Sequence, residues 1–317
     1  MLPNLCVLIL GGGGFVGGHL HTALVARFGT RVRIINTTRT PTNPDTLALD
    51  LSKTEDVRDL VVRERPTHVI NLVGIASPVE AQRNPELAWE LHALAPYKIG
   101  QMLRETLPNT WFFHVSSGLI YGRAALDVDL VDETIRLDPM DIYSMTKAAG
   151  DMAVGVLAGE GLNCIRLRPF NHTGPKQTES FAVPAFAAQL ARIKVGAQEP
   201  IIEVGNLSAI RDFLDVRDVV NAYVALIEQS ADLTTGTIYN IASGVGCRMQ
   251  DILESLIKIS NVAVTVELDH ARQRPSDLPR ILGDATALKR DTGWIAGFAL
   301  QRTLTDVLDG FYATVGI

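Results

Sequence analysis

The chain has 317 residues, of which 47% are hydrophobic and 20% are charged, so it can bury the core of one large domain or of two associated lobes. Its formal net charge of −6 gives no broad positive field, which argues against binding to nucleic acid or to an anionic membrane. The cysteines lack CxxC spacing, no signal peptide precedes the first apolar run, and no run reaches the ~18 residues of a membrane helix. We therefore expect a soluble, cytoplasmic protein without a metal site.

Apolar strands and helix-patterned stretches alternate through the first half of the chain. The expected strands are Leu5–Leu10, Val32–Ile35, Val69–Val73, Phe112–Ser116 and Asn163–Leu167. The expected helices are Phe15–Phe28, Thr54–Glu64, Pro85–Thr106 and Tyr143–Gly159. This alternation predicts a Rossmann-like α/β fold with a doubly wound parallel sheet, in which ligands bind at the carboxyl ends of the strands.

The regular alternation ends at Arg168, and the remainder predicts a smaller, discontinuous α/β lobe. A loop- and helix-rich stretch runs from Pro169 to Asn206, Arg211–Ile227 reads as a strand and then a helix, and Thr237–Ile241 reads as a further strand. We assign residues 1–168 and 208–242 to the sheet domain. Residues 169–207 and 243–317 form the predicted substrate-binding lobe.

A glycine-rich segment, Gly11-Gly12-Gly13-Gly14-Phe15-Val16-Gly17, follows the first expected strand directly and opens a helix. Gly11 permits the tight turn, Gly14 lets the backbone approach a pyrophosphate, and Gly17 lets the helix pack close to the strand. The N–H groups at the helix start then bind the phosphates. This position in the chain predicts a dinucleotide site, which also includes Phe15 and Val16.

The end of the second expected strand indicates which nicotinamide cofactor is bound. A site for NAD normally places an acid here to bind the ribose 2′-hydroxyl, but no acid occurs between Arg31 and Pro44. Arg39 can instead pair with a 2′-phosphate, helped by Thr37 or Thr38. We predict NADP(H) and keep NAD(H) as an alternative, because Arg39 also suits a solvated surface position.

Two further segments complete the predicted cofactor site. Asp50 and Leu51 can hold the adenine, although they suit a helix-capping region equally well. Leu72, Val73 and Gly74 come at the end of an expected strand, and therefore at the same edge of the sheet.

Tyr143 and Lys147 are four residues apart at the start of an expected helix, so they share one helical face. A phenol with a reference pKa of about 10 is a poor base at neutral pH, and a nearby ammonium lowers that pKa. Tyr143 can then exchange a proton with a carbonyl oxygen. Ser117, which we favour over Ser116, follows a strand and can donate a hydrogen bond to the same oxygen. The three side chains predict a catalytic set for hydride transfer.

The glycine loop, the segment Ser116-Ser117-Gly118-Leu119-Ile120-Tyr121-Gly122 and the Tyr143/Lys147 pair together resemble the extended short-chain dehydrogenase/reductases, which modify nucleotide sugars. The likeness covers essentially the whole chain. Its second half resembles the members of this superfamily that act on GDP-linked sugars. The segments that carry this likeness are Arg168–Pro175, Gln198–Pro200, Val204–Leu207, Arg211–Asp218 and Arg274–Asp277.

The resemblance implies roles for residues of the second lobe. Phe170 is expected at the cofactor and Asn171 at the sugar or its phosphate. Arg211 and Arg274 would bind the GDP diphosphate and ribose, with Ser276 and Asp277 nearby. Each arginine, taken alone, can equally form a surface ion pair, for example Arg211 with Asp212 or Asp215.

The same resemblance implies a reductase. The family's 4,6-dehydratases use acidic residues directly after the active-site Ser or Thr, where this chain has Gly118 and Leu119. The expected reaction is NADPH-dependent reduction of the C4 ketone of a GDP-linked 4-keto-6-deoxy sugar, GDP-4-keto-6-deoxy-D-mannose, to GDP-6-deoxy-D-mannose. Formation of the 6-deoxy-talose product, a 4-epimerase and a non-catalytic NADP-sensing module are the alternatives.

Three features depart from the family pattern, and one of them is Met140-Asp141-Ile142 before Tyr143 in place of the usual Ser-Pro. His92 stands where the family usually has Asn, and it is either a core histidine or a hydrogen-bonding partner of the backbone or of a structural water. Lys176 replaces a usual Gly.

The resemblance also implies a homodimer formed through the helices at Pro85–Thr106 and Tyr143–Gly159.

Overall fold

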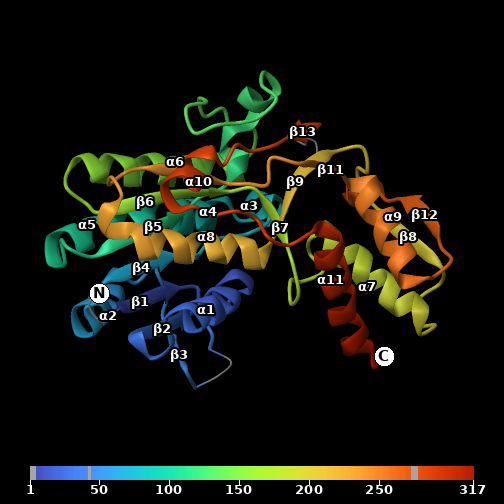
Figure 1. Ribbon diagram of the computed structural model, residues 1–317, viewed down its shortest axis with the longest axis horizontal. Coiled ribbons are helices and arrows are strands. Elements are labelled where there is room, and N and C mark those ends of the chain that lie inside the picture. The colour runs from blue at the N-terminus through green and yellow to red at the C-terminus, as the bar shows by residue number, and fades with distance from the viewer. Residues whose placement is uncertain (1–4, 42–43, 273–277) are drawn as a thin grey trace.

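A seven-stranded parallel sheet forms the larger part of the molecule in the computed structural model, which describes residues 5–41, 44–272 and 278–317 (Figure 1). Every neighbouring pair of strands runs parallel. In spatial order the strands are β10 (Ile238–Ile241), β6 (Cys164–Pro169), β5 (Trp111–Val115), β4 (His68–Asn71), β1 (Leu5–Leu10), β2 (Val32–Thr38) and β3 (Thr46–Ala48). The order reverses between β1 and β4, which creates the crevice where such sheets bind ligands.

Helices cover both faces of this sheet, as the doubly wound prediction requires. Alternate residues of β1 point to opposite faces. Leu5, Val7 and Ile9 pack in one apolar core with α1 (Phe15–Phe28), α8 (Val216–Gln229) and α10 (Thr286–Thr292). Cys6, Leu8 and Leu10 pack in a second core with α2 (Thr54–Glu64), α5 (Ala95–Thr106) and α6 (Ile142–Gly159). The predicted Rossmann-like fold is confirmed.

Most predicted elements agree with the structure to within a few residues. The expected helix at Pro85–Thr106 is instead a succession of α4 (Pro85–Trp89), a π-helical turn (Glu90–Leu94) and α5, preceded by α3 (Pro78–Arg83). A π-turn inserts one extra residue into a helix and is frequent at functional sites, and the apolar pattern does not reveal it.

The second lobe lies beyond the end of the sheet and has its own core (Figure 1). Its four-stranded sheet consists of β7 (Asn171–Thr173), β9 (Ile210–Asp215), β11 (Gly246–Arg248) and β13 (Arg280–Ile281). A two-stranded sheet of β8 (Ile201–Val204) and β12 (Thr265–Leu268) packs with α7 (Ala182–Lys194), α9 (Met249–Ser260) and α11 (Leu300–Val315). The chain crosses between lobes repeatedly, since β9 belongs to the second lobe while α8 and α10 cover the large sheet.

Candidate active site

The turn between β1 and α1 has the geometry that the glycine spacing predicts. Gly11 has a φ of +87°, which a side chain would strain, and its N–H donates to the Thr37 carbonyl at 3.1 Å. A Cβ on Gly17 would lie 2.5 Å from the Gly11 carbonyl oxygen, so this close packing requires glycine. Gly14 is the N-cap of α1 without a side-chain cap, and the first turn carries no acid. The turn therefore fits an anionic pyrophosphate.

The end of β2 lies against the glycine loop. A Cβ on Gly13 would meet the Thr38 side chain at 3.1 Å, and the next residue, Arg39, is exposed. Asn36, which the sequence analysis did not include, lies here too: its Oδ1 is buried without a partner among the described residues, and its Nδ2 lies 2.8 Å from Nδ1 of His21. Its position at the strand end, where NAD sites place an acid, was the signal that identifies it.

Asp50 and Leu51 occupy the turn that follows β3. Leu51 is buried in the core that contains β1. The Asp50 carboxylate accepts hydrogen bonds from the Ser52 hydroxyl at 2.8 Å and the Ser52 N–H at 3.0 Å. These bonds, and to a smaller degree the charges of Lys53 and Arg39, lower the pKa of Asp50. Asp50 therefore orders this turn, and its electrostatic interaction with Arg39 places it near the end of β2.

The loop after β4 lies in space between the glycine loop and the helix predicted to carry the catalytic residues. A Cβ on Gly11 would lie 3.2 Å from Cγ2 of Val73, and the N–H of Leu72 donates to the Leu10 carbonyl at 2.9 Å. One residue further on, a Cβ on Gly74 would lie 3.1 Å from Nζ of Lys147. Residues 72–74 therefore lie between the pyrophosphate turn and the buried ammonium.

Tyr143 and Lys147 lie in the first turns of α6, which starts one residue earlier than expected. Asp141 caps this helix: its carboxylate accepts the Ser144 N–H at 2.7 Å, and the Asp141 N–H donates to the Ser144 hydroxyl at 3.1 Å. Lys147 is 6% exposed and donates to the Val115 carbonyl at 3.1 Å. Burial lowers the pKa of Lys147 to about 8. The cap and this bond fix the helix start against the end of β5.

Ser117 begins the segment that follows β5. Its Oγ accepts the Leu119 N–H at 3.2 Å, which leaves the hydroxyl proton to be donated elsewhere. Leu119 packs in the same apolar cluster as Tyr143, so the segments that carry Ser117 and Tyr143 are neighbours. The neighbouring Ser116 hydroxyl donates to the Lys147 carbonyl at 3.3 Å and so supports α6. The preference for Ser117 over Ser116 stays a prediction.

Two aromatic residues join the lobes at this edge. The buried ring of Phe170 lies where a Cβ on Gly118 or on Gly283 would meet it, at 2.8 Å and 2.5 Å respectively. His172, which the sequence analysis did not include, stacks on Phe15 with 6.3 Å between ring centroids and 5° between planes. Phe15 opens α1, so β7 lies beside the pyrophosphate turn.

Asn171 and Arg211 belong to the same sheet of the second lobe. Asn171 pairs with Phe213, two residues from Arg211 on β9, so the side chains of Asn171 and Arg211 share a face. Arg211 is 7% exposed and donates to the Ile210 carbonyl at 2.9 Å. Three other predicted substrate residues, Arg274, Ser276 and Asp277, lie outside the described residues.

The acids next to Arg211 have partners of their own. The Asp212 carboxylate accepts the N–H groups of Ser243, Gly244 and Gly283 at 2.8, 2.9 and 3.2 Å. Burial raises the pKa of Asp212 in spite of these hydrogen bonds. Asp215 forms an ion pair with Arg217 at 2.6 Å. These acids therefore stabilise loops and the start of α8.

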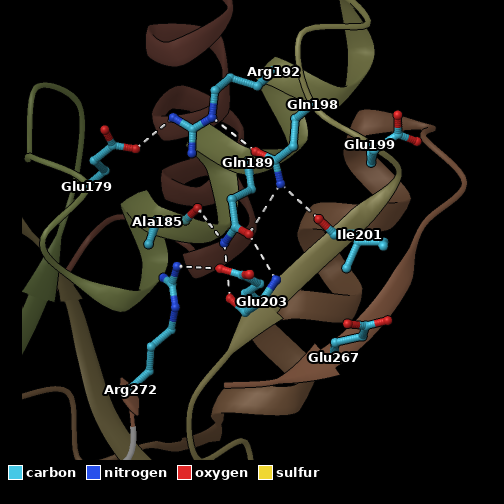
Figure 2. A pocket seen from close by; sticks show the side chains of 10 residues that line it. All are labelled: Glu179, Ala185, Gln189, Arg192, Gln198, Glu199, Ile201, Glu203, Glu267 and Arg272. Atoms are coloured by element: carbon cyan, nitrogen blue, oxygen red, sulfur yellow. Dashed lines mark hydrogen bonds and ion pairs between the residues drawn. The ribbon is translucent and has the colours of Figure 1, made fainter. Parts of the chain in front are cut away.

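A polar cleft of about 540 Å³ lies in the second lobe between α7, β8 and β12 (Figure 2). Arg192 bridges Glu179 and Gln198 on one side, and Arg272 pairs with Glu203 at 3.0 Å on the other. Among the residues that the structure describes, none of the predicted site residues lines it. Its lining holds four carboxylates and two guanidiniums, so it suits a neutral hydrogen-bonding group better than a phosphate.

Two kinds of feature are missing from the part of the chain that the structure describes. No group of three or more His, Cys, Asp or Glu side chains there could hold a metal ion. Within the same residues, every helix is too short or too polar to cross a membrane.

Known proteins with similar sequences and structures act on nucleotide sugars. The chain is 31% identical, over 98% of both proteins, to the GDP-6-deoxy-D-mannose reductase of Pseudomonas aeruginosa. It is 24% identical, over 89% of both proteins, to a GDP-6-deoxy-D-talose 4-dehydrogenase of Aggregatibacter actinomycetemcomitans. The structure of RMD from Pseudomonas aeruginosa complexed with NADPH matches with a TM-score of 0.86 at 30% identity, over 98% of this chain and 99% of that one.

The fold and the glycine turn, together with these relatives, define the class: an NAD(P)-dependent oxidoreductase of the extended short-chain dehydrogenase/reductase type. Within this class the family model described as GDP-mannose 4,6 dehydratase matches residues 8–307. The chain belongs to that family.

Proposed function

We propose that the protein uses NADPH to reduce the C4 ketone of GDP-4-keto-6-deoxy-D-mannose, giving GDP-6-deoxy-D-mannose (GDP-D-rhamnose). The observation that carries this proposal is that Ser117 is followed by Gly118 and Leu119, which cannot transfer protons. A 4,6-dehydratase must remove the C5 proton and expel the C6 hydroxyl, whereas hydride transfer to an existing ketone needs neither step. The similarity to the Pseudomonas aeruginosa reductase over 98% of the chain supports the same reaction.

The catalytic roles follow from the chemistry of three side chains. The Ser117 hydroxyl donates a hydrogen bond to the ketone oxygen, and Tyr143 gives its proton to that oxygen as negative charge develops. NADPH, when bound, supplies the hydride. The Lys147 ammonium favours the tyrosinate left behind, because an adjacent positive charge lowers the pKa of a phenol.

The cofactor is held by residues at the ends of β1, β2, β3, β4 and β6 and by residues of α6. Gly11, Gly14 and Gly17 place the first-turn N–H groups of α1 against the pyrophosphate. Thr38 and Arg39 bind the 2′-phosphate, a role for which a planar guanidinium is well suited. The remaining assigned contacts come from Phe15, Val16, Asp50, Leu51, Leu72, Val73, Gly74, Tyr143, Lys147 and Phe170. The similar RMD structure contains NADPH, which supports NADP(H).

The second lobe holds the nucleotide sugar in this proposal, and the sheet domain holds the cofactor. The predicted division gives residues 169–207 and 243–317 to the sugar lobe and residues 1–168 and 208–242 to the sheet domain. However, β9, which carries Arg211, belongs to the sheet of the second lobe, and α10 packs on the large sheet. Asn171 contacts the sugar or its phosphate. Arg211 and Arg274 bind the diphosphate and ribose, with Ser276 and Asp277 beside them. Arginine forks suit this task because the chain carries a net charge of −6 and must neutralise a diphosphate locally.

A second product is favoured by one relative. The similarity to a GDP-6-deoxy-D-talose 4-dehydrogenase supports interconversion of a C4 ketone with the opposite C4 configuration. The same three catalytic residues serve both outcomes, because only the face of the ketone that meets the cofactor differs.

A homodimer is the assembly that we propose. Several apolar residues are exposed on neighbouring helical segments: Leu94 at the end of the π-turn, Tyr97 on α5, and Met152 and Val156 on α6. A second copy of the chain would cover them in a four-helix contact. Val156→Glu should shift the mass measured by analytical ultracentrifugation from dimer to monomer, whereas a wild-type monomer would contradict the assembly.

The proposed reaction is tested by incubating the protein with NADPH and a GDP-keto sugar freshly made by a 4,6-dehydratase. We expect one NADPH consumed per sugar, and an NMR spectrum of GDP-6-deoxy-D-mannose. The talose isomer would establish the second product. No conversion of the keto sugar, or conversion without consumption of NADPH, would refute the proposal.

A further inference from the structure

His92 lies in the π-helical turn at Glu90–Leu94, between α4 and α5, and its side chain is completely buried. Both ring nitrogens have partners. The N–H of Ile75 donates to Nε2 at 2.9 Å, and Nδ1 lies 2.8 Å from the hydroxyl of Thr146. The imidazole also meets the Tyr143 ring edge-on, with 5.5 Å between centroids. One side chain therefore contacts both the loop after β4 and the first turns of α6.

These partners determine which nitrogen carries the proton. Because Nε2 accepts the Ile75 N–H, the proton of a neutral ring must be on Nδ1, which donates to the Thr146 oxygen. The Thr146 hydroxyl can then donate to the carbonyl of Ile142 at 2.8 Å or of Tyr143 at 3.1 Å. Every donor in this chain of hydrogen bonds then has an acceptor.

A protonated His92 would break this arrangement. A proton on Nε2 would face the Ile75 carbonyl at 3.1 Å, but the buried Ile75 N–H would lose its acceptor. The surroundings of the ring oppose protonation as well. Burial, then the positive charge of Lys147 and to a smaller degree the interaction with His114, lower the pKa of His92 to about 2, although the hydrogen bond with the Ile75 backbone acts in the opposite direction. The ring is therefore neutral throughout the working pH range.

The contacts also lie where the chemistry is proposed. A Cβ on Gly74 would lie 3.0 Å from Nε2 of His92 and 3.1 Å from Nζ of Lys147, so ring and ammonium flank the same backbone segment. A Cβ on Gly150 would lie 1.9 Å from the His92 carbonyl oxygen, so α6 packs directly against the π-turn. Any shift of His92 would thus move α6 relative to the loop at residues 74–75.

We infer that His92 is a positioning residue, which ties the first turns of α6 to the loop after β4 and so holds the Tyr143 hydroxyl at the ketone without exchanging a proton. This inference rests on the proposed reductase function. A displacement of about 1 Å at a reacting group can lower a rate by about a hundredfold, so the cost of losing the tie falls on kcat.

Kinetics of three variants test the inference. His92→Ala should lower kcat by about tenfold or more with the KM values for NADPH and sugar within about twofold. His92→Asn should recover most of kcat with an unchanged pH profile, because an amide both accepts and donates hydrogen bonds but does not titrate.

His68→Ala is the matched control. His68 is also buried, and its two ring nitrogens lie 2.9 Å from the hydroxyls of Thr67 and Ser230. It lies on β4, at the opposite end of the strand from Asn71 and the loop at residues 74–75. Its loss should lower the melting temperature and leave kcat unchanged. An equal loss of kcat in His68→Ala and His92→Ala would reduce His92 to a structural residue. A slow His92→Asn with an altered pH profile would make the imidazole a proton carrier, and either outcome overturns the inference.

NMR gives a second test that does not depend on turnover. Nitrogen shifts of His92, assigned by their loss in His92→Asn, should show a proton on Nδ1 and no titration between about pH 5 and about pH 9. Exchange of the Ile75 amide should be slow in the wild type and fast in His92→Ala. A titrating ring or an unprotected Ile75 amide would refute the tie. If the wild type fails to reduce the keto sugar while these NMR results hold, the proposed reaction fails and the tie survives.

Discussion

The edge of the large sheet that we propose binds the cofactor and the face of the second lobe that we propose binds the sugar are assembled in different ways. At that edge of the large sheet, Gly11, Thr38, Gly74 and Ser117 each lie at the end of a strand or within three residues after it, so a short sequence motif is enough to place them. In the second lobe, the sheet that carries Asn171 and Arg211 is built from segments between residues 171 and 281. The difference teaches that short local motifs place the residues proposed for catalysis and cofactor binding, whereas the residues proposed for substrate recognition are brought together by pairing between distant strands.

The largest effect is expected at the cofactor edge. Tyr143→Phe removes the proton donor, so kcat should fall by about 10²–10⁴-fold while the Kd for NADPH stays within about twofold. Stopped-flow absorbance and fluorescence titration measure the two quantities. Tyr97→Phe, at an exposed position on α5, serves as the control and should turn over normally. Normal turnover by Tyr143→Phe would mean that the cofactor edge does not supply the chemistry.

Burial of the Lys147 ammonium should lower the free energy of unfolding by an amount that depends on pH. The folded pKa of Lys147 is about 8, below its value in the unfolded chain, so folding releases a proton between these two values and stability rises with pH there. Below about pH 8 the full cost, at most about 3 kcal/mol, is present. Lys147→Met should therefore unfold at higher denaturant concentration than the wild type at pH 7, with a gain that shrinks above about pH 9. A gain that is constant with pH would contradict the burial argument.

Two adjacent glycines separate the effect of close packing from that of helix propensity. Gly17→Ala places a Cβ 2.5 Å from the Gly11 oxygen, so the pyrophosphate turn must shift, and the Kd for NADPH should rise about tenfold or more. Gly18→Ala is the matched control, because its Cβ would meet no atom within 4 Å. Isothermal titration should show unchanged binding in that variant. Equal affinities for the two variants would remove the glycine loop from the cofactor site.

A substitution in the second lobe should affect the binding of the substrate. Arg211→Lys keeps the charge but loses the planar fork, so the KM for the GDP-keto sugar should rise about tenfold with the KM for NADPH unchanged. Initial-rate kinetics at saturating NADPH measure it. A rise in both KM values, with a lower melting temperature, would show instead that Arg211 holds the sheet together.

The smallest expected effect comes from relieving backbone strain, which occurs in both regions. Lys176 and Arg65 both have positive φ, +73° and +45°, a conformation that glycine adopts without strain. Lys176→Gly and Arg65→Gly should each raise the unfolding free energy by about 0.5 kcal/mol, with no effect on activity. Loss of activity in Lys176→Gly alone would show that the lysine side chain, and not the backbone, is used in the second lobe.

Sequence patterns predicted the large sheet well, because its strands are short apolar runs that alternate with helix-patterned stretches. Gly11 and Gly17 were identified by spacing, and the structure gives each a steric reason. Their roles in binding, like those of Ser117, Tyr143 and Lys147, stay predictions. The expected role of Asp50 in binding the adenine also stays a prediction, and the structure shows that its carboxylate accepts hydrogen bonds from Ser52.

Other features were beyond the reach of pattern analysis. The π-turn around His92 arises from packing between α4, α5 and α6, which no local propensity encodes. Asn36 was missed because the position near the end of the second strand was searched for an acid, and the buried Oδ1 of Asn36, which has no partner among the described residues, becomes evident only in the fold. The cleft beside Glu203 forms from three separate elements, so only the folded chain brings its lining together.

The central claim is that hydride moves from the cofactor to C4 of a ketone. The most direct test is to supply NADPH carrying deuterium at the transferred position of the nicotinamide, with the GDP-keto sugar in ordinary water. The account predicts one deuterium at C4 of the product and a slower turnover when hydride transfer limits the rate. A product whose C4 carries only hydrogen, or whose label appears at another carbon, would contradict it.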